Sequence, residues 1–221
     1  MTPSKIIRSK RRTLSISIND NAELIVRAPH KLSIDKIHDF IIEKEKWLNK
    51  QKNIVNKRLS DSFLDKDMAL YLGSLFPIKT AQSQSNKLTF NGEEFLAGSS
   101  EQEIINLSLK KWYKNKFKEV AIPRLTYFAD KYNISVNQVR IKEQKTLWGS
   151  CSSRNNINLN YLLIMAPMYV IDYVIIHELV HTIHKNHSVN FWKTVESMMP
   201  KFKEAKSWLK EFGYKLRKLQ F

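Results

Sequence analysis

Three histidines and one glutamate in the last quarter of the chain have the spacing of a metal site. His177, Glu178 and His181 form the pattern His-Glu-x-x-His, and His187 follows six residues after His181. Residues four apart on a helix lie on the same face, so His177 and His181 can offer imidazole nitrogens to one cation. Glu178 adjoins the first histidine and can reach a metal-bound water. The pattern predicts a zinc-dependent hydrolase with Glu178 as general base.

The residues around this motif favour a metal site over a chance pair of histidines. The preceding segment, Val170–Ile176, is almost entirely apolar, so we expect a helix that is buried on most sides. Buried polar groups need partners, and a shared metal ion would supply one. Four of the six histidines of the chain also lie between His177 and His187.

The third ligand has one leading candidate and two alternatives. A catalytic zinc usually keeps three protein ligands, and His187 has the spacing of the third histidine in the long form of the motif. That form has Gly where this chain has His184, so we expect Asn186 to supply the left-handed turn instead. His184 shares a helical face with His177 but lies about 10 Å along the axis from it. Glu196 is the other alternative, as a downstream glutamate ligand.

Composition predicts an ordinary globular protein. The 221 residues are 43% hydrophobic, enough for one or two domains. The single cysteine, Cys151, excludes an intramolecular disulfide and reads as a small buried residue rather than a ligand or nucleophile. The most apolar stretch, Tyr161–Ile176, is interrupted by Pro167 and Asp172 and is too short to span a bilayer. We therefore expect a soluble cytoplasmic protein without a membrane segment.

The net charge of +16 raises the question of nucleic-acid binding. The chain has 28 Lys but only 9 Arg, and Arg is the residue preferred for bidentate recognition of phosphates and bases. The balance favours weak, non-specific affinity for nucleic acid over specific recognition.

The first part of the chain is predicted to be rich in β-structure. Residues 14–18 and 24–26 alternate as a hairpin does, and residues 69–78 predict a second hairpin around Gly-Ser. Between them, Ser33 is expected to cap one helix that ends near Arg58.

The second part is predicted to be mainly helical. A long helical pattern covers residues 101–131, where Pro123 should kink or restart the helix. Strands are expected near residues 136–141 and 157–160. Ser188 is expected to cap a short helix after the metal site. We place the domain division at a Gly-Ser segment, which gives an N-terminal β-hairpin and helix domain over residues 1–98 and a second domain over residues 99–221.

Several short segments together resemble one known family. They are Trp148-Gly149-Ser150-Cys151, Ile157-Asn158-Leu159-Asn160, Tyr173 to His181, Asn186-His187-Ser188 and Phe191-Trp192. This set is similar to the YgjP-like metal-dependent hydrolases, which are related to the SprT-like and WLM proteases. The resemblance implies metal ligands at His177, His181 and His187, and a catalytic role for Glu178. Family members often have Arg before the Trp-Gly-Ser-Cys segment, whereas this chain has Leu147.

The resemblance also completes the predicted fold class. We expect an α+β protein, with an N-terminal β-rich segment containing one helix and a C-terminal zincin-like helical domain with a small antiparallel sheet. The expected activity is that of a metallopeptidase acting on a protein or peptide through Zn²⁺. Alternatives are a zinc hydrolase of non-peptide amides or esters, and a DNA-stimulated protease like the SprT-like relatives. A structural zinc is disfavoured, since such sites usually use several cysteines.

Other roles remain open from sequence alone. The strand at residues 157–160 is either the sheet edge that pairs with an extended substrate or ordinary core structure. Arg154, Asn160 and Tyr161 are all possible stabilisers of an oxyanion. Trp148 and Trp192 are expected to pack in the core beside the metal helix.

Overall fold

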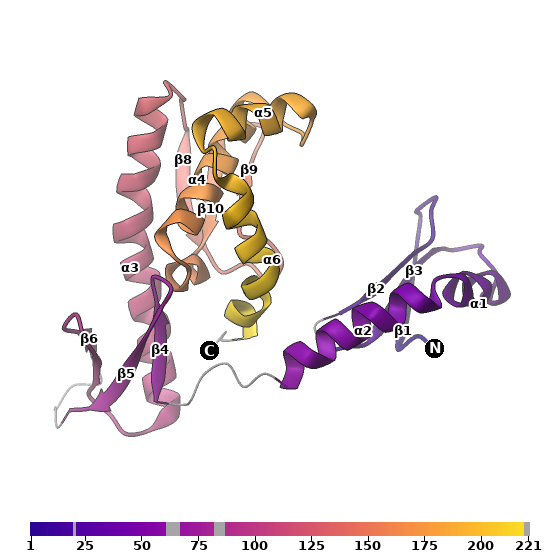
Figure 1. The fold of residues 1–221 in the computed structure, drawn as a ribbon, viewed down its shortest axis with the longest axis horizontal. Helices are drawn as coiled ribbons and strands as arrows, with labels where there is room; N and C mark the ends of the chain where they lie inside the picture. The colour runs from indigo at the N-terminus through magenta and orange to yellow at the C-terminus, as the bar shows by residue number, and fades with distance from the viewer. Residues whose placement is uncertain (20, 61–66, 82–86, 219–221) are drawn as a thin grey trace. The chain divides into compact units, whose positions relative to one another are not determined.

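The computed structural model describes residues 1–19, 21–60, 67–81 and 87–218. The chain divides into two compact units, Met1–Phe63 and Leu64–Phe221, which we call the N-terminal and C-terminal units. The expected α+β class is confirmed: small sheets and helices occur in both units (Figure 1). The sequence-based division at residues 98 and 99 falls inside the C-terminal unit and stays a prediction.

The N-terminal unit packs two helices on a three-stranded sheet. Its strands lie in the order β1-β3-β2, and the predicted hairpin of β2 and β3 is confirmed as antiparallel. Strand β1 was not predicted; it pairs in parallel with β3. The bounds are β1 Lys5–Ser9, β2 Ser15–Ile18, β3 Leu24–Pro29, α1 Ile34–Glu43 and α2 Glu45–Ser60.

The prediction of a single helix after Ser33 is wrong, because the structure has two helices there. Ser33 does cap α1, because its hydroxyl accepts a hydrogen bond from the Lys36 amide at 3.4 Å. The helix then ends at Glu43, and a separate helix, α2, begins at Glu45. The change of direction allows apolar residues of both helices to reach one core, formed by Leu24, Val26, Ala28, Ile37, Ile41 and Leu48.

The C-terminal unit begins with a second sheet, in the order β4-β5-β7-β6. The predicted hairpin of β4 and β5 is confirmed, and its turn has Leu72 and Gly73 at positive φ. Both turn residues donate backbone hydrogen bonds, to Ile164 and Met165, so the turn docks near the start of the metal helix. The bounds are β4 Met68–Tyr71, β5 Ser74–Thr80, β6 Leu88–Phe90 and β7 Phe95–Ala97.

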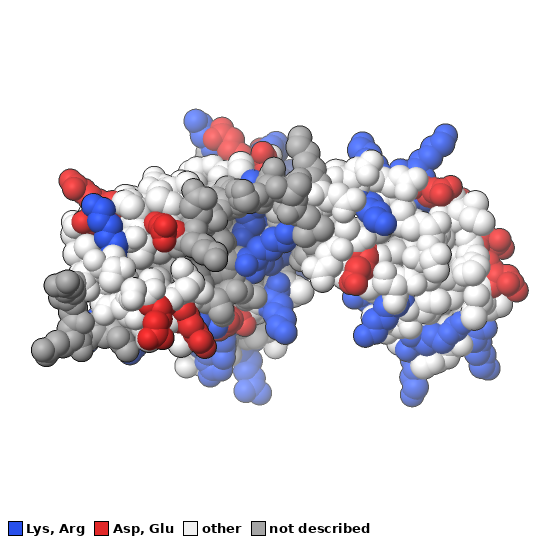
Figure 2. All heavy atoms as spheres, turned by 90° about the horizontal axis from the view of Figure 1, so that it is seen from below, with Lys and Arg blue, Asp and Glu red and all other residues white. Residues whose placement is uncertain are grey.

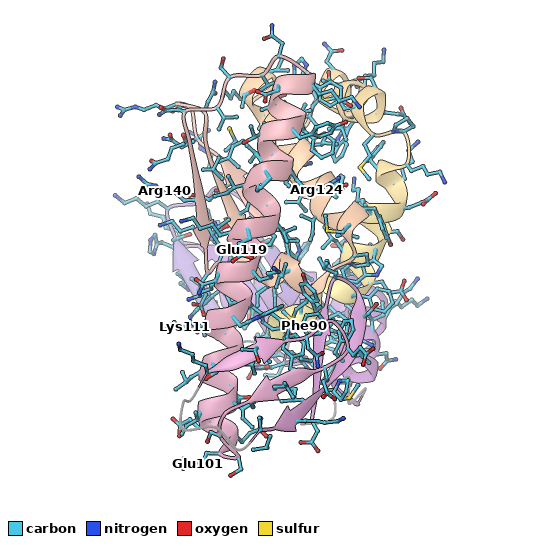
Figure 3. All side chains as sticks on the ribbon, turned by 90° about the vertical axis from the view of Figure 1, so that its left-hand side faces the viewer. Phe90, Glu101, Lys111, Glu119, Arg124 and Arg140 are labelled. Carbon is cyan, nitrogen blue, oxygen red and sulfur yellow. The ribbon has the colours of Figure 1, made fainter. Side chains whose placement is uncertain are left out.

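Helix α3 (Gln102–Lys131) is the longest element, and at 1.5 Å per residue it extends about 45 Å. It continues through Pro123, so the expected restart does not occur; buried residues on both sides of the proline hold the helix in place. Its first half packs on the second sheet, where Trp112 contacts Phe95 at 4.9 Å between ring centroids. Figure 3 shows α3 along its length, with Lys111, Glu119 and Arg124 labelled on it and Glu101 just before its start.

The third sheet lies beside the predicted metal helix and has the order β8-β10-β9. It is mixed rather than purely antiparallel, because β8 and β10 are parallel while β9 and β10 are antiparallel. Strand β10 (Asn156–Asn160) is therefore central, and the idea that residues 157–160 form a sheet edge is wrong. The edge nearest the metal motif is β9 (Gly149–Cys151), while β8 spans Gln138–Lys142.

The remaining elements are helical. A buried 3₁₀ segment, η1 (Tyr161–Met165), leads into α4 (Met168–Ile183), which is followed by α5 (Val189–Met198) and α6 (Phe202–Lys218). Helix α4 packs between α3 and α6 (Figure 1). No helix among the described residues is long and apolar enough to cross a membrane. On the face drawn in Figure 2, basic side chains are interspersed with acidic ones.

Candidate metal centre

Helix α4 carries the His-Glu-x-x-His motif and is buried along most of its length. Its apolar residues from Val170 to Val180 fill the space between α3, the third sheet and α6. A bidentate ion pair between Arg124 of α3 and Asp172 fixes its first turns, with Arg124 Nη2 at 2.6 Å from Asp172 Oδ2. The helix therefore presents His177 and His181 from a rigid support.

The loop after α4 brings His187 back to the same place. Helix α4 ends at Ile183, and His184 is extended, with φ −118° and ψ 106°. Ser188 then caps α5 as predicted, accepting a hydrogen bond from the Phe191 amide at 3.3 Å. The expected left-handed conformation at Asn186 is wrong, because its φ is not positive. The chain leaves the helix at the extended His184 and bends at Lys185 and Asn186.

The three motif histidines converge. His187 Nε2 lies 3.0 Å from His177 Nε2 and 3.2 Å from His181 Nε2, and one nitrogen of each ring lies within 4.8 Å of the others. Ligand nitrogens about 2.0–2.1 Å from a tetrahedral zinc would be about 3.4 Å apart. The cluster thus has the dimensions of a three-nitrogen metal site with slight adjustment. No fourth His, Cys, Asp or Glu joins it within the described ranges.

The protonation of these rings suits metal binding. Burial, followed by the two neighbouring histidines and Lys206, lowers the pKa of His177 to about 3. Burial also lowers the pKa of His181. His181 Nδ1 lies 3.0 Å from the His184 carbonyl oxygen, so it donates its proton there and keeps a lone pair on Nε2. Both rings are therefore neutral at neutral pH and can act as ligands.

Glu178 is buried beside the cluster. Its side chain is 4% exposed, and burial raises its pKa to about 8. It lines the same cleft as His177, a hollow of about 340 Å³ walled by residues 146–149, α4 and α6. Its Oε2 atom has no hydrogen-bond partner among the described residues. An unpartnered buried carboxyl oxygen in a cleft is suited to accept a proton from a bound molecule.

Strand β9 is held close to Glu178 by Asn160, which is fully buried. The Asn160 amide nitrogen donates to the carbonyl oxygens of Gln144 and Leu147, and its backbone N–H donates to the Trp148 carbonyl. These bonds fix the segment that leads to Gly149. Both amide protons of Asn160 are thereby used within the fold.

Gly149 leaves room for the Glu178 carboxyl group. A Cβ atom at Gly149 would lie 2.6 Å from both Cγ and Oε1 of Glu178. We expect Gly149→Ala to displace the carboxyl group and to lower kcat/KM by about 10- to 100-fold, since misplacement by about 1 Å can have an effect of this size. Metal content should stay unchanged. Ser150→Ala, on the opposite face of β9, is the matched control; equal activity of both variants would contradict this role for Gly149.

The alternative ligands lie outside the cluster. The His184 ring nitrogen Nε2 is 3.2 Å from the Thr194 hydroxyl, and exposed Glu196 pairs with Lys203 at 3.2 Å. His184 contributes through its backbone carbonyl, a role that no sequence pattern indicated. Cys151 is half-buried on β9 and also lies outside the cluster.

The three possible oxyanion residues do not line the cleft with Glu178. Arg154 is exposed in a turn, Tyr161 is buried, and Asn160 is bonded to backbone. Tyr173, one turn before His177, does line the cleft and was not predicted from the sequence as a site residue. Burial and then Glu178 raise its pKa to about 12.

The two tryptophans lie beside the metal site, as expected, but both are half-buried rather than enclosed in the core. Trp148 lines the cleft, with the Arg217 guanidinium 4.6 Å from its ring centroid. Trp192 stacks on His187 at 5.6 Å between centroids. Leu147, where the family often has Arg, is 50% exposed at the cleft.

A buried helix bearing a histidine pair, a third histidine from the following loop and an adjacent carboxyl group define a metallopeptidase type of site. Comparison with known families agrees: residues 12–212 match the YgjP-like family, described as YgjP-like, metallopeptidase domain. The chain belongs to this family and is thus a metal-dependent peptidase.

Two solved structures are also similar to part of the chain. The metallopeptidase zymogen abylysin of Pyrococcus abyssi is 24% identical, with a TM-score of 0.38, covering 42% of this chain and 95% of its own. The metallopeptidase zymogen jannalysin of Methanocaldococcus jannaschii is 22% identical, with a TM-score of 0.37, covering 41% of this chain and 94% of its own. A comparison with curated proteins found no match.

Proposed function

We propose that this protein is a zinc-dependent peptidase that cleaves peptide bonds, with His177, His181 and His187 as ligands and Glu178 as general base. The observation that carries the proposal is a three-nitrogen cluster without a fourth protein ligand in the described residues, beside a buried carboxyl group in the same cleft. Structural zinc sites are closed by four protein ligands, whereas catalytic sites keep a position open.

The residues present fit a zinc ion. Imidazole nitrogen is a preferred zinc ligand, and the low pKa values of His177 and His181 keep those rings neutral. When bound, zinc supplies Lewis acidity, which lowers the pKa of a coordinated water and polarises a carbonyl group.

Glu178 supplies the proton transfers in this proposal. Its carboxylate removes a proton from the attacking water and then, as the acid, gives a proton to the leaving amine. A carboxyl group in an apolar wall has a raised pKa, which suits both halves of this cycle near neutral pH. A nearby metal cation favours the ionised form before the reaction.

Substrate binding is proposed along β9. This strand pairs with β10 on one side and lies at the edge of its sheet. An extended peptide can add to such an edge through main-chain hydrogen bonds. Because Gly149 belongs to β9 and contacts Glu178, a peptide on this edge would pass beside the general base.

Metal removal is the direct test. We expect the purified protein to hold about one equivalent of zinc and to cleave members of a mixed peptide library, with products identified by mass spectrometry. A chelator should abolish cleavage, and stoichiometric zinc should restore it, because zinc supplies the Lewis acid. Cleavage that survives complete metal removal would contradict the proposal. Hydrolysis of non-peptide amides or esters alone would replace it by the broader hydrolase function.

A further inference from the structure

Two lysines of α6 form one wall of the cleft beside Glu178. Lys206 and Lys210 are one helical turn apart, and both line the cleft together with Leu209. The Lys206 side chain is anchored near the metal cluster: its Nζ lies 4.0 Å from the centroid of the Trp192 ring. That ring in turn stacks on His187. The Lys206 ammonium group is thus held next to Trp192, which itself contacts the proposed ligand His187.

The positive charge of Lys206 is not balanced by an exposed acidic residue of the described cleft lining. Glu178 is the only acidic residue among the described residues that line it, and it is buried. In the part of the chain that the structure describes, Lys206 forms no ion pair, whereas Lys203 on the same helix pairs with Glu196 at 3.2 Å. Binding of a divalent metal by the histidines would make the cleft still more positive.

Apolar side chains make up much of the remaining lining of the cleft. Trp148 and Val174 contribute to its walls, and Leu209 lies between the two lysines on α6. A volume of about 340 Å³ is at the small end of ligand pockets, which suits one or two side chains of a peptide. A group that fits this lining has an aliphatic or aromatic body and an anionic end.

We propose that this cleft recognises a carboxylate of the substrate peptide close to the scissile bond, with Lys206 as the specificity-determining residue. The inference rests on the proposed peptidase function. The carboxylate has two possible sources, the side chain of an Asp or Glu residue, or the free C-terminus of the peptide. In both cases the Lys206 ammonium group pairs with the carboxylate, while Trp148 and Leu209 contact the apolar part.

The test compares matched peptides. One set places Glu, Gln or Lys at each position that flanks the cleaved bond, with the C-terminus amidated throughout. A second set has a neutral sequence with either a free or an amidated C-terminus. We expect kcat/KM to be about tenfold higher for the peptide with the carboxylate, as for a partly exposed charge-assisted contact. Preference within the first set identifies a side chain as the source; preference within the second identifies the C-terminus.

Variants of Lys206 connect the preference to this wall. Lys206→Gln should reduce the Glu-to-Gln ratio to between about 1 and 3, and Lys206→Glu should reverse it in favour of the Lys peptide. Lys203→Gln is the matched control, because Lys203 lies on the same helix but outside the cleft. This control should keep the wild-type ratio. Ratios near 1 in both peptide sets with the wild type, or a preference for the carboxylate peptide that survives Lys206→Glu, would overturn the proposal.

A binding measurement separates this inference from the proposed function. Zinc-loaded Glu178→Gln protein is titrated with the same peptides labelled with a fluorophore, and anisotropy is recorded. Tighter binding of the carboxylate peptides supports the inference even if the wild type cleaves none of them, an outcome that would overturn only the peptidase function. Equal binding of all peptides by this variant would overturn the inference even if every peptide is cleaved by the wild type.

Discussion

Glu178→Gln is expected to lower kcat by at least about 10³-fold while leaving the metal in place. General bases contribute typically 10²- to 10⁴-fold, and Gln keeps the size of Glu but cannot take a proton. Glu178 is outside the cluster of three histidines, so the ligand set is unchanged. The measurement is single-turnover cleavage of a peptide identified in the library, together with metal analysis of the same sample.

The stability of the metal-free variant provides a control for correct folding. The pKa of Glu178 is about 8 in the folded protein and near 4.5 in an unfolded chain. Its protonated form therefore stabilises the fold at low pH, and this stabilisation is lost as pH rises towards and through 8. His177 has the opposite shift, with a folded pKa of about 3, so its effect is confined to pH below about 6.5.

Between pH 6.5 and 8, the change in folding stability caused by ionisation of Glu178 should therefore be measurable without a contribution from His177. Ionisation on unfolding corresponds to about 2 kcal/mol over this interval, or a decrease in Tm of about 4–8 °C. The Gln variant should lack this decrease. A variant that retains full activity would refute the general-base assignment, and one that loses both metal and the folded baseline would show a structural effect instead.

The parts of the site that were predictable from sequence are those set by local spacing. A four-residue spacing on an apolar segment is sufficient to place His177 and His181 on one face of α4. Ser188 was predictable as a cap because its hydroxyl acts only three residues away. For the same reason the two hairpins, whose strands are neighbours in sequence, agree with the expected pattern.

The parts that were not predictable depend on distant partners. Whether residues 157–160 form a central or an edge strand is decided by β8 and β9, and alternation of side chains is the same in both cases. Strand β9 is only three residues long and has no apolar alternation. Gly149 matters because Glu178, 29 residues later, occupies the space of a Cβ atom.

The position of the lysines of α6 in the cleft was also not predictable from the sequence. From the sequence, Lys206 and Lys210 are expected to lie on a solvent-exposed helix face, because lysines are frequent throughout this basic chain. They line the cleft only because α6 packs on α4, and this packing was not predictable from the sequence. Likewise, the role of the His184 carbonyl group was not predictable, because it follows from the extended conformation after Ile183.

His187→Ala is expected to weaken zinc binding by more than the 10- to 100-fold that loss of an outer partner causes, because a ligand itself is removed. In the wild type, zinc at 100 times its Kd should stabilise the fold by about 2.7 kcal/mol, which raises Tm by roughly 5–11 °C. The variant should show little of this increase. Differential scanning fluorimetry with and without zinc measures both, and competition with a chromogenic chelator gives the affinity.

The two alternative ligands provide matched controls for this experiment. His184→Ala removes a ring that contacts Thr194 but keeps the carbonyl group that orients His181. Glu196→Gln removes a carboxylate that pairs with Lys203. Both should retain the zinc-dependent rise in Tm, because neither side chain belongs to the cluster. If Glu196→Gln lost zinc while His187→Ala kept it, the third ligand would be the downstream glutamate, and α5 would have to shift to bring it to the metal.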